Sequence, residues 1–126
     1  MDWLAAYVAT LLIEVPAVLI LMRAAGWTPR RADGGLSLPA AVAVAWLVNL
    51  THPVLWWARP TEVGALLTAE VLVVVVEGLA LALIGTRALR LRSWLVLLTG
   101  LLIALAANLA SFAGGLVLYE VGWLRS

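Results

Sequence analysis

Four long apolar stretches, separated by short polar segments, dominate the pattern of this chain. Each stretch is about twenty residues or longer, which is enough to cross the hydrocarbon core of a bilayer as one α-helix. The segments between them are rich in Arg, Gly and Pro, which is typical of loops. The pattern predicts four transmembrane spans, at residues 3–22, 38–57, 62–85 and 94–119.

The composition supports a membrane protein. Of the 126 residues, 65% are hydrophobic and only 12% are charged, too few to cover the surface of a soluble fold. The first stretch does not read as a cleavable signal peptide, because no Lys or Arg precedes it and Glu14 and Pro16 interrupt it. We therefore predict an all-α polytopic membrane protein, a single domain over residues 1–126 folded as a four-transmembrane-helix bundle.

The distribution of Arg predicts how the chain crosses the membrane. All eight basic residues are Arg, and six of them lie in the first and third loops. The positive-inside rule places these two loops in the cytoplasm and both termini outside it. Trp27 and Trp57 lie at span ends, where interfacial aromatic residues belong. The Ala-, Leu-, Val- and Arg-rich composition is typical of GC-rich bacterial genomes, so we expect a bacterial inner (plasma) membrane.

The composition also argues against several classes of function. A net charge of +1 offers no basic face for phosphates, which argues against a nucleic-acid partner. Cys is absent, so disulfides and thiolate metal sites are excluded. With one His and no Gly-x-Ser-x-Gly elbow, an enzyme is less favoured than a non-enzymatic role, and the sequence requires no cofactor.

Polar residues within the spans are the candidates for function. Glu70 and Glu77 lie seven residues apart, so they share a face of the third helix. An acid inside the bilayer costs about 2.5–3.5 kcal/mol and normally faces protein or water. We predict that such residues converge on one binding region for a substrate or ion, made up of Glu14, Asn49, His52, Glu70, Glu77, Asn108 and Ser111.

The expected depths of these residues distinguish the two acids of the third span. Counting residues from the outer ends of the spans places Glu14, Asn49, Glu70 and Asn108 at similar depths, at about 1.5 Å per residue. We therefore expect Glu70 to meet the other three, with the imidazole nearer the outer surface. The same count leaves Glu77 deeper, without a partner from another span.

Two further patterns concern packing. Ala45–Leu50 and Ala104–Leu109 share the spacing Ala-x-x-x-Asn-Leu, which favours two parallel helical hairpin repeats about an axis along the membrane normal. Small residues recur every four positions in the second and fourth spans, a spacing that allows close helix approach. These stripes are Ala41, Ala45 and Asn49, and Ala107, Ser111 and Gly115.

Two functional hypotheses follow. The first is a proton- or cation-coupled transporter, or a subunit of one, in which the intramembrane carboxylates and the imidazole carry the ion. The second is a non-catalytic assembly subunit of a membrane complex, in which the same residues are interhelical hydrogen-bond glue. In either case the partners are the lipid bilayer and, because four short helices enclose little volume, a homo-oligomer or a larger complex.

A metal site is a further hypothesis. Glu14, His52, Glu70 and Glu77 are the candidate ligands, since carboxylate and imidazole groups suit divalent zinc, manganese or iron. No pair of ligands close in the sequence, as in the His-Glu-x-x-His motif, supports such a site.

The first span carries one resemblance. Glu14-Val15, Met22-Arg23 and Gly26-Trp27-Thr28 resemble the first helix of small multidrug resistance exporters. The resemblance implies that Glu14 binds drug or protons. The third span departs from that family, because it lacks the Gly- and Trp-containing packing motif and carries two additional acids. The Arg asymmetry also departs from the family's dual topology.

Overall fold

The computed structural model describes residues 3–28, 35–58, 62–89 and 93–122, and every regular element in these ranges is an α-helix. Four helical segments are long and apolar enough to cross a membrane, which confirms the predicted four-span bundle. The helices are α1 (Trp3–Ala24), α2 (Leu38–Val48), α3 (Thr51–Ala58), α4 (Val63–Leu89) and α5 (Ser93–Glu120).

The second predicted span is divided into two helices. α2 ends at Val48 and α3 begins at Thr51, whereas the sequence pattern predicts one helix over 38–57. Pro53 explains the position of the break: its ring collides with the carbonyl four residues earlier, that of Asn49, and it has no N–H to donate there. The backbone instead forms tighter hydrogen bonds between residues three apart, from Leu50 to Leu47 and from His52 to Asn49.

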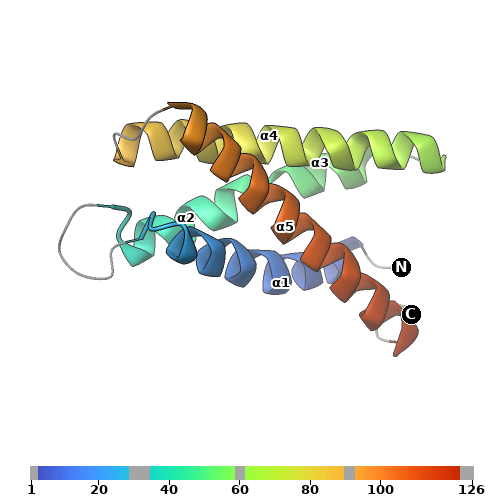
Figure 1. Ribbon diagram of the computed structural model, residues 1–126. Coiled ribbons are helices and arrows are strands. Elements are labelled where there is room, and N and C mark those ends of the chain that lie inside the picture. The colour runs from blue at the N-terminus through green and yellow to red at the C-terminus, as the bar shows by residue number, and fades with distance from the viewer. Residues whose placement is uncertain (1–2, 29–34, 59–61, 90–92, 123–126) are drawn as a thin grey trace.

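The divided span connects the two halves of the bundle. α2 packs against α1 and α3 packs against α4, while α5 packs along α4 and crosses α1. Figure 1 shows α5 running diagonally across the other helices, with α2 and α3 on the far side. α1 begins and α5 ends on the same side of the bundle, as an even number of spans requires.

The end of α1 contains a buried Trp. Gly26 adopts a φ of +76°, and the N–H of Trp27 donates to the carbonyl of Met22, the arrangement of a Schellman cap. The chain then turns the Trp27 side chain into the core, where it is 1% exposed. Trp27 follows the end of α1, as predicted, but its side chain packs into the protein core, whereas that of Trp57 is exposed.

α4 is longer than predicted, and Trp27 explains the glycine at which the predicted span ends. The predicted span ends at Gly85, but the helix continues to Leu89. A Cβ atom on Gly85 would lie 2.9 Å from the Trp27 ring and 2.6 Å from Val96, so this glycine makes room for two side chains and does not end the helix.

α4 and α5 approach each other closely at glycines. A Cβ atom on Gly100 would lie 2.6 Å from the carbonyl oxygen of Gly78 and 2.9 Å from the backbone nitrogen of Ala82. Such contacts are shorter than real Cβ atoms make, so the backbones meet because these side chains are missing. The predicted stripe of the fourth span is buried at Ala107, but the position of a Gly115 Cβ is open.

The outer surface of the bundle is apolar. Large side chains along α4 and α5 are exposed around the helices, including Leu72, Leu79, Leu102 and Leu105. Their exposure is what a helix facing lipid hydrocarbon requires, and it agrees with the length and hydropathy of the four spans.

We predict that Gly100→Ala lowers the free energy of unfolding by about 1–3 kcal/mol, because the added methyl group overpacks a backbone contact. Gly115→Ala is the matched control, since nothing lies within 4 Å of its Cβ position. Reversible unfolding in detergent measures both changes. Equal stability of the two variants would contradict the close contact between α4 and α5.

Candidate functional site

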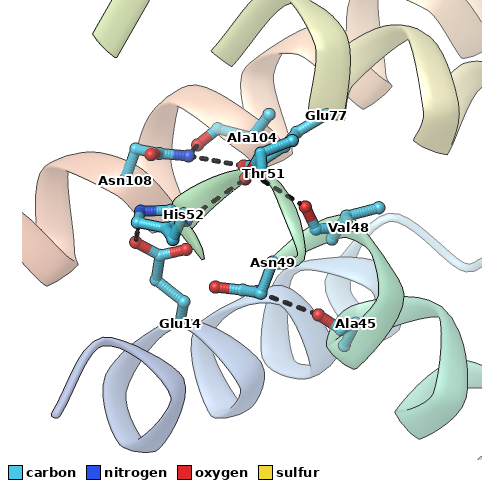
Figure 2. Close-up of polar contacts among 9 residues, drawn as sticks. All are labelled: Glu14, Ala45, Val48, Asn49, Thr51, His52, Glu77, Ala104 and Asn108. Atoms are coloured by element: carbon cyan, nitrogen blue, oxygen red, sulfur yellow. Dashed lines mark hydrogen bonds and ion pairs between the residues drawn. The ribbon is translucent and has the colours of Figure 1, made fainter. Parts of the chain in front are cut away.

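Three titratable side chains from three different helices meet inside the bundle. Glu14 comes from α1, His52 from α3 and Glu77 from α4, and one ligand atom of each lies within 4.8 Å of the others. All three are buried, with exposed fractions of 1%, 6% and 2%. Figure 2 shows the imidazole between the helices that carry the two acids. We call these three residues the central cluster.

The central cluster lies at the middle of the apolar spans. Glu14 is the central residue of the 21-residue span Leu4–Ala24, and Glu77 is the central residue of the 21-residue span Leu67–Arg87. His52 reaches the same place because it follows the break between α2 and α3. Non-helical backbone at this depth is tolerated in membranes where protein covers it.

Glu77 is held by two hydrogen bonds. The Thr51 hydroxyl donates to Oε1 at 2.6 Å, and the Asn108 amide donates to Oε2 at 2.7 Å. The Thr51 hydroxyl also lies 3.1 Å from the Val48 carbonyl, but its single hydrogen serves one acceptor at a time. Both oxygens of this carboxyl group are therefore satisfied by side chains of the bundle.

The break in the second span is capped by its own side chains. The Asn49 amide donates to the carbonyl of Ala45 at 2.9 Å, and Thr51 lies within reach of the carbonyl of Val48. The carbonyl of Val48 loses its usual donor at the break, because the N–H of His52 bonds to the carbonyl of Asn49 instead. Asn49 and Thr51 thus have a structural role that is independent of any ligand.

Glu14 contrasts with Glu77. Neither of its carboxyl oxygens has a hydrogen-bond partner among the described residues, although it is the more deeply buried of the two acids. The half-buried Ser111 side chain lies near it, but no hydrogen bond of ordinary geometry joins them. A buried carboxyl group without donors is costly, so this half of the central cluster lacks what the other half has.

His52 lies between the two acids. Its Nε2 is 3.5 Å from Oε1 of Glu14, and its Nδ1 is 3.7 Å from Oε1 of Glu77. Each nitrogen of one imidazole therefore faces a different carboxyl group. Arg23 and Arg87, the arginines in the described part of the chain, are both exposed. Among the described residues, His52 is therefore the one buried side chain at the cluster that can carry a positive charge.

The uncompensated atoms around the cluster are mainly acceptors. Besides the Glu14 oxygens, Asn49 Oδ1, Asn108 Oδ1 and His52 Nδ1 are buried without a hydrogen-bond partner among the described residues. The two amides cannot be turned over, because their nitrogens already donate to the carbonyls of Ala45 and Ala104. Apart from one N–H of the imidazole, these atoms therefore offer lone pairs, which are the groups that bind a cation.

The structure reverses the expected roles of the two acids of α4. Glu77, expected to lack partners, belongs to the central cluster, and Glu70 is half-buried and outside it. The depth count started at residue 62, the outer end of the predicted span, whereas the apolar part of α4 runs from Leu67 to Arg87 and is centred on Glu77. The metal hypothesis loses Glu70 for the same reason and keeps the other three residues.

Thr51 is the one residue of the site that the sequence patterns did not single out. Its signal was its position just before His52 and Pro53, at the point where the proline interrupts the helix. A hydroxyl at such a break is available to carbonyls or to a neighbouring helix, and here it reaches Glu77.

The two segments of the proposed repeat make the same local hydrogen bond in the site. Asn49 and Asn108, equivalent in the two matching segments, each donate to the carbonyl four residues earlier at 2.9 Å. Asn108 also donates to the acid of its own hairpin, Glu77, whereas Asn49 makes no hydrogen bond with Glu14. The two hairpins are thus alike in their local bonding and differ at the acid.

No family model matches the chain, and comparisons with curated proteins and with solved structures give no significant match. The resemblance of the first span to small multidrug resistance exporters is therefore not supported by a match to that family. The class that the fold defines is a multi-pass α-helical membrane protein with a buried carboxylate–imidazole cluster.

We predict energetic coupling between Asn108 and Glu77. Asn108→Leu removes a donor from a buried carboxyl group and lowers the unfolding free energy by about 1–3 kcal/mol. Asn108→Leu combined with Glu77→Leu recovers most of that loss, because removing both partners leaves nothing unsatisfied. A double-mutant cycle in detergent measures the coupling. The same cycle with Glu70→Leu in place of Glu77→Leu is the control and should show no coupling. Coupling of Asn108 to Glu70 alone would contradict the structure and support the expectation, from residue depth, that Glu70 meets Asn108.

Proposed function

We propose that the protein is a small membrane transporter, or the membrane-spanning subunit of one, that binds a cation at the central cluster. The observation that carries the proposal is Glu14, a carboxyl group at the centre of the bundle whose two oxygens lack hydrogen-bond partners among the described residues. Acids inside membrane spans commonly mark ion and substrate pathways.

The asymmetry of the two acids favours transport over a purely structural role. If the polar residues served only to join helices, both carboxyl groups would be expected to have donors, as Glu77 does. The structural alternative accounts for Thr51, Asn49 and Asn108, which satisfy backbone carbonyls and Glu77. It does not account for Glu14, or for the surplus of acceptor atoms around it.

The site also has the position that a transporter needs. A ligand bound at the middle of a bilayer is equally remote from both sides, and interrupted helices commonly supply the polar groups there. The break between α2 and α3 supplies His52 in this way. A path from the cluster to either side needs more room than four helices enclose, so we also propose that the chain works as an oligomer or in a larger complex.

We predict that a cation stabilises the wild-type protein and not Glu14→Gln. Binding to the folded state alone raises the unfolding free energy by about 2.7 kcal/mol at a concentration one hundred times Kd. Thermal unfolding in lipid nanodiscs is measured with sodium, potassium, magnesium, calcium, manganese, zinc and tetraphenylphosphonium. At least one of these cations should raise the wild-type midpoint in a saturable way.

Glu62→Gln is the matched control, because Glu62 is exposed and lies just before α4, 15 residues before Glu77 in the sequence. It should respond as the wild type does. Glu14→Gln should fold without cations at least as well as the wild type, since it removes a buried carboxyl group without donors. If no cation stabilises the wild type, or if Glu14→Gln responds equally, the structural alternative replaces the transport proposal.

A further inference from the structure

The two nitrogens of His52 face different acids, so Glu14 and Glu77 are expected to have different roles. Because its two nitrogens face opposite carboxyl groups, one ion cannot lie on both sides of the ring at once. A neutral imidazole carries hydrogen on one nitrogen and a lone pair on the other. With the hydrogen on Nδ1, it points toward Glu77 at 3.7 Å, and the lone pair on Nε2 points toward Glu14 at 3.5 Å.

The hydrogen bonds that the two carboxyl groups already make favour the same placement of the imidazole hydrogen on Nδ1. Glu77 already accepts hydrogen bonds at both oxygens, so its carboxyl group is fixed on the Nδ1 side of the ring, although 3.7 Å is longer than a hydrogen bond. Glu14 has both oxygens without hydrogen bonds, so it is suited to bind an ion directly. A carboxyl group that accepts from the far nitrogen of a metal-binding His is the common outer-shell arrangement in proteins.

The spacing between Glu14 and His52 fits a small ion. Ligand atoms about 2.0–2.1 Å from a tetrahedral ion lie about 3.3–3.4 Å from one another. The observed separation of Oε1 and Nε2 is 3.5 Å. The oxygen of Asn49 is a third group on this side: it is buried without a hydrogen-bond partner among the described residues, and Figure 2 shows it directed toward Glu14.

We propose that Glu14 and His52 Nε2 are direct ligands of a divalent transition-metal ion, that Asn49 Oδ1 supplies a third oxygen, and that Glu77 positions the imidazole. This inference rests on the proposed function and names the class of its cation. An imidazole nitrogen favours zinc, manganese, iron or cobalt over magnesium and calcium, which prefer oxygen ligands alone.

Charge supports a divalent ion. When both carboxyl groups are ionised and the imidazole is neutral, the cluster carries a charge of −2, and the described arginines are exposed and provide no compensation. A divalent ion cancels that charge, whereas a monovalent ion leaves one unit uncompensated in a low-dielectric interior. With two strong ligands and one amide oxygen, the ion is held less firmly than in closed four-ligand structural sites, as a transported ion must be.

The test is metal binding by the untagged protein in lipid nanodiscs. Zinc and cobalt are titrated at equilibrium, with magnesium and calcium as competitors. We expect one ion per chain, binding that survives an excess of magnesium or calcium, and loss of at least about 100-fold in affinity for Glu14→Gln and His52→Gln. Glu77→Gln should keep the stoichiometry, bind about 10–100-fold more weakly, and change the cobalt absorption spectrum because the imidazole is no longer oriented.

A second measurement needs no variant. The chain contains one His, so nitrogen coupling in pulsed electron paramagnetic resonance of the manganese- or copper-loaded protein identifies His52 as the ligand. Glu62→Gln is again the control and should bind as the wild type does.

The outcomes separate this inference from the proposed function. Transition-metal binding without imidazole coupling, or with unchanged affinity in His52→Gln, overturns the ligand set. Glu14-dependent binding of an alkali, alkaline-earth or organic cation, with none of zinc or cobalt, overturns the inference and leaves the proposed function standing. Failure of every cation to bind overturns both.

Discussion

The need to keep two carboxyl groups away from lipid at the centre of the membrane governs this structure. Each acid costs about 2.5–3.5 kcal/mol if it is inserted without partners, and Glu14 and Glu77 occupy the central positions of their spans. Other features serve this need. The second span is interrupted at Asn49 so that Thr51 and His52 reach both acids. α4 and α5 meet at Gly78 and Gly100, which brings two helices together along the length that carries Glu77 and Asn108.

The two acids are protected to different degrees, and the difference separates structure from function. Glu77 resembles a polar contact of an ordinary helical interface, with two side-chain donors from neighbouring helices. Glu14 is as deeply buried, and neither of its oxygens has a hydrogen-bond partner among the described residues, although an imidazole nitrogen lies 3.5 Å away. A protein selected only for stability would gain from a donor beside Glu14 or from an apolar residue in its place. The sequence retains an acid there, which is why we assign the ligand to this side of the cluster.

The sequence predicted much of this arrangement, and the failures have physical causes. Span number and approximate limits follow from apolar length alone, and the expectation that polar residues of different spans meet inside the bundle follows from the cost of polar groups in lipid. The choice between Glu70 and Glu77 did not follow, because counting depth requires knowing where the apolar part of a helix begins, and in α4 it begins at Leu67 and not at residue 62. The position of Trp27 depends on a turn after α1, which composition does not reveal. Pro53 was visible, yet the division of the span depends on whether neighbouring side chains cap the break.

The interrupted second span has a consequence for biogenesis. It is the least apolar of the four, with a mean hydropathy of 1.5 against 2.3, 2.3 and 2.2 for the others, because Asn49, Thr51 and His52 lie within it. Partitioning from the translocon into lipid depends on the summed hydrophobicity of a segment, so this segment has the weakest tendency to enter the bilayer alone. Its polar side chains become acceptable to the membrane once α1 and α4 surround them. Completion of membrane insertion and assembly of the central cluster are therefore expected to be a single event.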